Sequence, residues 1–251
     1  MTPRLNINVD HVATVRQARR APEPSVLAAA LVCEEAGADG ITVHLRGDRR
    51  HIQDDDLYIL KRSVTTYLNV EMAATEEMMR IALDVRPDAV TLVPETPHEI
   101  TTEGGLDVVA NFDTVRRCVE RLKESGQFVS LFVDPEARQL EASREAGADQ
   151  VELCTAAYAD ATLGARGLRD DGRRRAEAEL RRLRESAVFA AGQNLHVAAG
   201  HGLTYRNVSA LAAVAQITEY NIGHNVIAHA IFAGLAEAVR EMRRRIMDGQ
   251  S

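Results

Sequence analysis

The sequence predicts an α/β protein built as a (β/α)8 TIM barrel, in one domain over residues 1–251. Short β-branched runs alternate with amphipathic helical stretches along the chain, which is typical of parallel βαβ units. The segments "EEAGADGI" (34–41) and "REAGADQV" (144–151) are near copies, each with a helix end, a glycine and a turn into a strand. Eight such units in a chain of this length favour a closed barrel. An open, doubly wound sheet is the alternative, but it usually needs fewer strands, and no GxGxxG follows the first one.

Each expected strand is a short run of β-branched and other apolar residues bounded by turn residues. In chain order the strands are expected at Leu5–Val9, Gly40–Leu45, Tyr67–Met72, Ala89–Val93, Phe128–Val133, Gln150–Cys154, Asn194–Ala198 and Glu219–Ile222. Helical patterns between them include 25–37, 75–85 and 112–126. The segment 159–186 looks inserted, and we expect a long loop that continues as a helix whose Arg and Glu residues form a solvated face.

Composition excludes several classes of function. The chain has 251 residues, of which 45% are hydrophobic, so it can bury a full core. Its net charge of −7 gives no broad basic surface for nucleic acid. No apolar run approaches the roughly 20 residues that span a bilayer, and the first residues lack the pattern of a signal peptide. Three widely spaced cysteines, Cys33, Cys118 and Cys154, fit reduced thiols and a cytoplasmic location.

Polar side chains gather where the expected strands end. Alternate residues of a strand face the same side, so Asn6, Asn8 and Asp10 share one face of the first strand, opposite an apolar set. The same alternation leads to polar residues at the ends of the later strands, which are His44, Arg46, Glu71, Glu95, Asp134, Glu152, His201 and His224. We expect the apolar sets to face the helices and the polar sets to gather at the carboxyl end of the barrel, where (β/α)8 enzymes place their active sites.

A structural role for single polar residues stays open, because an inward Asn6, Asn69 or Glu152 can be a satisfied polar group of the barrel interior. The gathering of several ionisable groups at one end of the barrel favours a functional role over a purely structural one. Buried ionisable groups are unfavourable without partners, and a purely structural core has little reason to gather acid–base groups at one end. The converging groups are His11, His44, Glu71, His201 and His224.

Two glycine-containing turns predict anion binding. "AAGHGLTYRNV" (198–208) leaves the seventh strand and is expected to enter a helix at about Thr204, and "YNIGHNVIAHAIFAGL" (220–235) leaves the eighth strand into another helix. Backbone N–H groups at such positions favour phosphate, and the loops after strands 7 and 8 often bind it in barrels. Arg46, His51 and an arginine group of the first loop suit a second anion, although Arg16 and Arg20 also fit plain surface residues.

Seven blocks together resemble the pyridoxine 5′-phosphate synthase family from about Leu5 to Met247. In chain order they are "NVDHVATVRQAR", "GADGITVHLRGDRRHI", "LNVEMA", "LVPE" with "TTEGGLDV", "VSLFVD", "VAAGHGLTYRNV" and "YNIGHNVI". The resemblance implies a (β/α)8 TIM barrel with extra helices that assembles into homo-octamers. It also implies the condensation of 1-deoxy-D-xylulose 5-phosphate with 3-amino-2-oxopropyl phosphate to pyridoxine 5′-phosphate, phosphate and water, with no metal and no organic cofactor.

The resemblance also implies roles for individual residues. His44, Glu71 and His201 correspond to the acid–base residues, and Glu152 to a polar helper near the reacting centre. The implied contacts to deoxyxylulose phosphate are Asp10, His11, Arg46, His51 and Thr101, and those to the aminoketone phosphate are Asn8, Arg19, Gly202, Gly223 and His224. Histidine suits repeated proton transfer because its pKa lies near neutral pH.

Two departures from the family pattern and two rival functions remain. The 159–186 segment is longer than usual, and Ala198 stands where the family commonly has Asn. A metal-dependent barrel hydrolase or isomerase would use the histidines and carboxylates as ligands, but the first strand lacks an HxH pair and arginine lies beside them. A non-catalytic protein that binds a phosphate ligand would need fewer acid–base groups.

Overall fold

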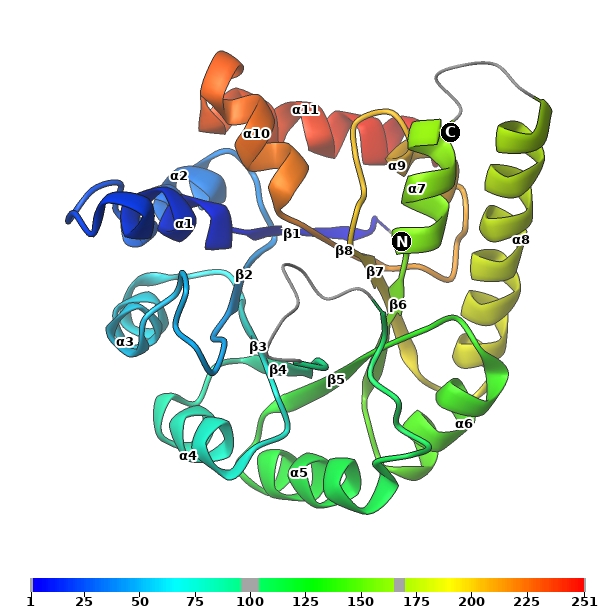
Figure 1. Ribbon diagram of the computed structural model, residues 1–251, viewed down its shortest axis with the longest axis horizontal. Helices are drawn as coiled ribbons and strands as arrows, with labels where there is room; N and C mark the ends of the chain where they lie inside the picture. The colour runs from blue at the N-terminus through cyan, green and yellow to red at the C-terminus, as the bar shows by residue number, and fades with distance from the viewer. Residues whose placement is uncertain (1, 96–103, 165–169, 251) are drawn as a thin grey trace.

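The eight strands form a closed parallel barrel at the centre of the molecule (Figure 1). The computed structural model describes residues 2–95, 104–164 and 170–250. The strands are β1 (Arg4–Asn8), β2 (Gly40–His44), β3 (Leu68–Met72), β4 (Ala89–Leu92), β5 (Phe128–Val133), β6 (Gln150–Cys154), β7 (His196–Gly200) and β8 (Glu219–Ile222). Each strand pairs with its neighbours in chain order, and β8 pairs with β1. The predicted (β/α)8 barrel is confirmed.

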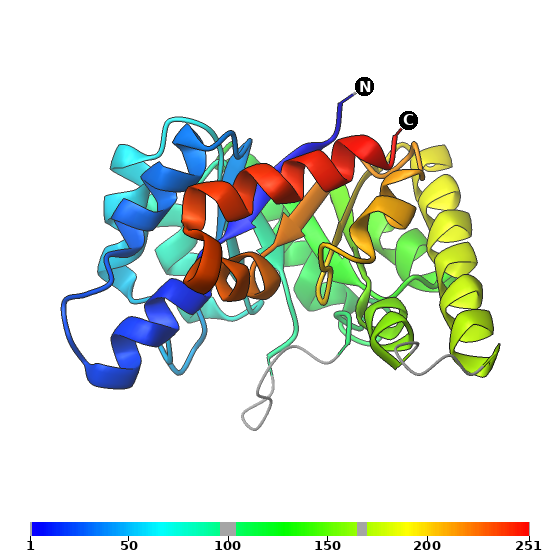
Figure 2. The ribbon, with the colours of Figure 1, turned by 90° about the horizontal axis from the view of Figure 1, so that it is seen from above.

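Helices surround the barrel and cover the outward apolar side chains of the strands (Figures 1 and 2). They are α1 (Asp10–Arg19), α2 (Val26–Glu35), α3 (Asp54–Ser63), α4 (Glu76–Val85), α5 (Phe112–Glu124), α6 (Ala137–Glu145), α7 (Ala156–Gly164), α8 (Asp170–Gly192), α9 (Val208–Ala212), α10 (His224–Ala233) and α11 (Leu235–Asp248). Two helices rather than one follow β1, β6 and β8, so the extra helices are confirmed. None of the described helices has the length and apolar character needed to cross a membrane.

Three local predictions were wrong. Strand β7 begins at His196 and not at Asn194, because Asn194 has a φ of 62° and belongs to the turn that ends α8. No helix begins at Thr204; the side chain of Asn207 accepts the Thr204 N–H in a turn, and the short α9 starts one residue after Asn207. The expected long loop at residues 159–164 is part of α7, whose alanine-rich sequence favours helix.

The barrel interior is polar, as the strand alternation predicted. Asn221 of β8 accepts a hydrogen bond from Thr42 of β2 at 3.1 Å and donates one to Glu152 of β6 at 2.7 Å. These strands are not neighbours, so the side chains meet through the inside of the barrel. Asn6 also donates to Asn221, at 3.1 Å. These buried polar groups are tolerated because they form hydrogen bonds with one another. The network extends toward the carboxyl ends of the strands.

Aspartates brace the opposite, amino end of the barrel. Three of them stand just before an even-numbered strand and accept a backbone N–H near the start of the preceding strand. The pairs are Asp39 with Leu5, Asp88 with Leu68 and Asp149 with Val129, at 2.9, 3.0 and 2.9 Å. Each carboxylate also pairs with a helix side chain, respectively Arg243, Lys61 and Lys123, at 2.8, 2.8 and 2.7 Å. The repeated "GAD" of 34–41 and 144–151 is therefore a structural repeat with one physical role.

Candidate active site

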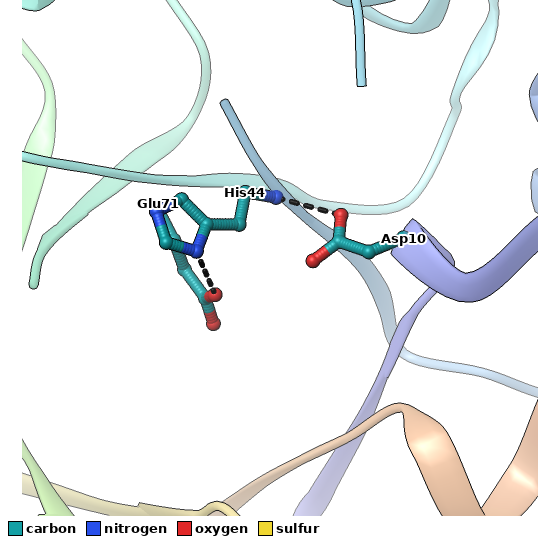
Figure 3. A group of neighbouring side chains, drawn as sticks. All are labelled: Asp10, His44 and Glu71. Carbon is teal, nitrogen blue, oxygen red and sulfur yellow. Dashed lines mark hydrogen bonds and ion pairs between the residues drawn. The ribbon is translucent and has the colours of Figure 1, made fainter. Parts of the chain in front are cut away.

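His44, at the end of β2, lies near two carboxyl groups, those of Asp10 at the start of α1 and Glu71 on β3 (Figure 3). Its backbone N–H donates to Oδ1 of Asp10 at 2.8 Å, and its Nδ1 lies 3.9 Å from Oε2 of Glu71. Asp10 and His44 are buried, and Glu71 is partly buried. The register pairs His44 with Glu71 across β2 and β3, so the strand pairing itself brings the imidazole and the carboxyl together.

Glu95 is a site residue that the sequence-based selection missed. Its Oε1 lies 3.0 Å from Nε2 of His44, and its Oε2 accepts the backbone N–H of Gly47 at 3.0 Å. The signal was present in the alternation of residues along the chain after β4. Thr91 bonds Asn69 inside the barrel, and Glu95 has the same parity as Thr91.

Two buried carboxyl groups in the barrel favour their protonated forms. Burial raises the pKa of Glu71 well above its ordinary value, and the nearby Glu152 and Asp10 raise it further. Burial likewise raises the pKa of Glu152 to about 8, with a further contribution from Glu219 and an opposing hydrogen bond from Asn221. Glu152 can therefore hold a proton near neutral pH and donate it, and the upward shift of the Glu71 pKa favours the same role.

Glu152 lies in a space that only a glycine leaves open. Gly200, at the end of β7, pairs in register with Cys154 of β6 and Asn221 of β8. A Cβ on Gly200 would overlap Oε1 of Glu152 and would lie 3.1 Å from both the Glu152 Cδ and the Asn221 carbonyl oxygen. The missing side chain lets the Glu152 carboxyl cross the inner face of β7 to reach the Asn221 amide.

His201 follows β7 with a backbone φ of 77°, which is uncommon for a residue other than glycine. The Thr155 hydroxyl donates toward the carbonyl oxygens of Gly200 and His201, at 2.8 and 2.5 Å, and holds this turn. The ring of His201 packs against Phe132, 5.8 Å between centroids. Burial lowers the pKa of His201, with Asp160 opposing, so the neutral imidazole, which can accept a proton, is favoured.

Gly202 continues the turn after His201 with a φ of 81°, and a Cβ there would lie 2.7 Å from the Ala159 side chain. It packs against the first turns of α7 rather than opening a helix of its own. The expectation that Gly202 stands at a helix N-terminus is therefore wrong.

Arg46 and His51 lie near each other beyond β2. Arg46 is only 4% exposed, yet its Nε has no hydrogen-bond partner among the described residues. Its nearest acidic partner is Asp48, with 3.8 Å between Arg46 Nε and Asp48 Oδ1. The His51 ring lies 6.1 Å from the His44 ring, and burial lowers the pKa of His51. A buried guanidinium with an unsatisfied donor suits an anionic ligand.

Asn8, His11, Gly223 and His224 meet where β1 adjoins β8. Gly223 precedes the first turn of α10, and a Cβ on it would lie 2.9 Å from the Asn8 Cβ. The rings of His11 and His224 lie 4.9 Å apart, and the buried Nδ1 of His11 has no partner among the described residues. Burial lowers the pKa of His11, and His224 lowers it further against the effect of Asp10. The start of α10 offers backbone N–H groups and a favourable dipole to an anion.

One predicted substrate contact, Arg19, is not part of this cluster. Arg19 is exposed at the last position of α1, nine residues beyond Asp10, which corresponds to roughly 13 Å along the helix. Thr101 lies outside the described residues.

Asp10, His44 and Glu71 also offer ligand atoms within 4.8 Å of one another, the geometry closest to a metal site in the described part of the chain. Asp10 accepts hydrogen bonds on both carboxylate oxygens, from the His44 N–H and from the Asn8 side chain. The arrangement therefore suits proton transfer better than metal coordination.

The closed barrel, with acid–base groups at the carboxyl ends of its strands, defines the class of the molecule as a (β/α)8-barrel enzyme. A family model described as pyridoxal phosphate biosynthesis protein PdxJ matches residues 5–248. The chain belongs to this family and is an enzyme of pyridoxal phosphate biosynthesis.

Curated relatives agree over nearly the full length. Proteins named pyridoxine 5′-phosphate synthase from Geotalea daltonii and Aquifex pyrophilus are 50% and 52% identical to this chain. Each match covers 95% of this chain, with 96% of the Geotalea protein and 99% of the Aquifex protein. A relative of the same name from Prochlorococcus marinus strain MIT 9303 is 52% identical over 97% of this chain and 96% of its own length.

Solved structures of other barrels share the fold alone. A 3-keto-L-gulonate-6-phosphate decarboxylase from Vibrio cholerae superimposes with a TM-score of 0.65 at 12% identity, covering 98% of both chains. A phosphoribosylanthranilate isomerase from Thermotoga maritima gives a TM-score of 0.58 at 15% identity, covering 98% of this chain and 99% of the other.

Proposed function

We propose that the protein makes pyridoxine 5′-phosphate by condensing 1-deoxy-D-xylulose 5-phosphate with 3-amino-2-oxopropyl phosphate, releasing phosphate and water. The observation that carries this proposal is the presence of two separate anion-suited regions on one rim. The buried guanidinium of Arg46 lies beyond β2, and the N-terminus of α10 follows Gly223. Acid–base groups line the barrel mouth on the strands between them. A reaction that joins two phosphorylated substrates needs this arrangement, whereas a single small phosphate does not.

The proposed division of the site follows these regions. Deoxyxylulose phosphate lies toward β2, with its phosphate near Arg46 and His51 and with Thr101 as a further contact. The aminoketone phosphate lies toward β8, on the N–H groups that follow Gly223, and His224 contacts it. The neighbouring rings of His11 and His224, 4.9 Å apart and tilted by 57°, stand where the two substrates meet in this proposal.

The chemistry requires proton transfers in both directions. The amine attacks the ketone, water and phosphate leave, and a ring closes and becomes aromatic. Glu71 and Glu152 are suited to donate protons to departing hydroxyl groups, because burial raises both pKa values and so favours the protonated forms. His201, favoured as the neutral imidazole, is suited to accept a proton, and His44 exchanges protons beside Glu71.

A homo-oligomer, expected to be an octamer in the cytoplasm, is part of the same proposal. Arg19 does not reach the site of its own chain. It lies four residues beyond Val15 on α1, so both share one helix face, and Val15 is 55% exposed. Ile231 and Phe232 on the adjacent α10 are 75% and 88% exposed. A second copy that covers this apolar surface would receive Arg19 in its own site, and Phe232→Asp should then reduce the assembly size in light scattering.

The decisive experiment separates the two phosphate regions. Arg46→Ala removes a charge-assisted contact, so we expect affinity for deoxyxylulose phosphate to fall roughly tenfold or more, with little change for the aminoketone phosphate. Gly223→Val should show the opposite preference, because its side chain would press on Asn8. Arg62→Ala, an exposed arginine in the last turn of α3, is the control and should change neither affinity. Equal weakening of both substrates by both variants, or no pyridoxine phosphate from the wild type, would refute the proposal.

A further inference from the structure

The Glu95 carboxylate lies at hydrogen-bond distance from Nε2 of His44, whereas Nδ1 is the ring nitrogen that lies near Glu71. We propose that Glu95 is a positioning residue: it keeps the proton of His44 on Nε2, so that Nδ1 is the nitrogen that exchanges protons with Glu71 and the substrate. The inference rests on the proposed function for its catalytic meaning. Its structural part, the tautomer of His44, stands on the contacts of Glu95 alone.

Both oxygens of Glu95 are engaged, which fixes the direction of the hydrogen bonds. Oε2 accepts the backbone N–H of Gly47, and Oε1 faces Nε2 of His44, each at 3.0 Å. An ionised carboxylate can only accept, so Nε2 must donate and Nδ1 is left with its lone pair. The Glu95 and His44 side chains are 14% and 8% exposed, so water competes little with this bond.

The two carboxyls that flank the His44 ring differ in protonation. Burial alone would raise the pKa of Glu95, but the hydrogen bonds from His44 and Gly47 and the charge of Arg46 hold it below its ordinary value. The pKa of Glu71 is shifted in the opposite direction by burial and neighbouring carboxylates. An ionised acceptor on one side and a proton-holding carboxyl on the other are the environments that separate acid and base roles.

The distance between His44 and Glu71 agrees with this assignment. Nδ1 of His44 and Oε2 of Glu71 are 3.9 Å apart, too far for a direct hydrogen bond. Among the described residues Nδ1 therefore has no hydrogen-bond partner, whereas Nε2 has one. The charged and titratable groups that face the ring are Asp10, Arg46, His51, Glu71 and Glu95.

Glu95→Gln is the sharpest perturbation because it keeps the shape and exchanges an acceptor for a donor. The backbone N–H of Gly47 still requires an acceptor, so the new amide oxygen turns toward Gly47 and the new NH2 faces His44. Nε2 must then accept, and the proton moves to Nδ1. We expect the fold to persist and turnover to fall by roughly 10²–10⁴-fold, as when a histidine is held in the wrong tautomer.

The tautomer of His44 is read directly by NMR of the free protein labelled with 15N-histidine, with His44→Gln to assign its signals. The wild type should show Nε2–H, Glu95→Gln should show Nδ1–H, and Glu95→Asp should restore Nε2–H with part of the activity. Glu124→Gln, an exposed carboxylate near the end of α5, is the matched control and should change neither reading.

Three results would overturn the inference: Nδ1–H in the wild type, Nε2–H in Glu95→Gln, or a loss of turnover in Glu95→Gln without a change of tautomer. The proposed function fails separately. If the tautomers behave as expected but wild-type protein forms no pyridoxine phosphate from the two substrates, the positioning by Glu95 stands and the reaction assigned to the site does not.

Discussion

Gly200→Ala should test whether the interior space at β7 is shaped for the Glu152 carboxyl. A methyl group at position 200 would overlap Oε1 of Glu152 and crowd the carbonyl oxygen of Asn221, which lies 3.1 Å from the Cβ position. Asn221 O is backbone and cannot yield, so Glu152 must move. The move breaks its 2.7 Å hydrogen bond from the Asn221 amide.

The magnitude follows from these two losses. Overpacking a filled interior costs about 1–3 kcal/mol, and a lost internal hydrogen bond adds about 0.5–1.5 kcal/mol. The free energy of unfolding should therefore fall by about 2–4 kcal/mol for Gly200→Ala. In a chain of this size that loss lowers Tm by roughly 4–16 °C. Chemical denaturation followed by circular dichroism measures the first quantity, and a thermal scan measures the second.

A double-mutant cycle identifies the cause. Glu152→Ala removes the group that the methyl overlaps, so adding Gly200→Ala to it should cost much less than in the wild type, with a coupling of about 1–3 kcal/mol. Gly192→Ala is the control, because no atom lies within 4 Å of its Cβ position, and it should stay within about 0.5 kcal/mol of the wild type or gain stability. Wild-type stability of Gly200→Ala, or strict additivity with Glu152→Ala, would refute the steric account.

Three further outcomes are expected. Asp149→Ala leaves the Val129 N–H without its acceptor and Lys123 without its carboxylate partner, so denaturant unfolding should show a loss of about 1–3 kcal/mol, and an unchanged midpoint would contradict the bracing role. The pKa of Glu152 is raised to about 8 in the folded state, so the stability it contributes is complete below its unfolded pKa near 4 and is lost as pH rises through about 8. Glu152→Gln should therefore flatten the fall in unfolding free energy between pH 5 and 9, and a fall of wild-type steepness would argue against the raised pKa. Dialysis against a chelator should leave turnover unchanged, whereas a loss restored by zinc, manganese or magnesium would revive the metal-dependent alternative.

Strand alternation predicted the polar interior because it depends only on local geometry. Side chains alternate with a period of two, so Asn6, Thr42 and Glu152 had to face one side once the strands were located. The structure confirms this through the hydrogen bonds of Asn221 with Thr42 and Glu152, because these two residues lie on strands that are not adjacent to β8. The same rule reached Glu95, yet it could not reveal that Glu95 meets His44, because that contact depends on the path of the chain after β4.

The parts that sequence could not predict depend on backbone conformation and on assembly. The start of β7 was misplaced because Asn194 adopts a positive φ, which its sequence neighbours do not determine. The sequence predicts a helix from about Thr204, but the structure has a turn there. The Asn207 side chain accepts the Thr204 N–H, and the sequence pattern does not reveal this contact. The resemblance places Arg19 in the site, whereas helix α1 sets it roughly 13 Å along its axis from Asp10.

The two ends of the barrel use carboxyl groups in opposite ways, and this separates stability from chemistry. At the amino end Asp39, Asp88 and Asp149 each accept a strand N–H and pair with a cation, so their charge is satisfied within the protein. At the carboxyl end Glu71 and Glu152 lack a paired cation among the described contacts, and burial pushes them toward the protonated form. A paired carboxylate gives up no proton near neutral pH, whereas an unpaired buried carboxyl can. Substitutions of the amino-end aspartates should therefore change stability before activity, and Glu→Gln substitutions of Glu71 and Glu152, which keep the shape of the side chain, the reverse.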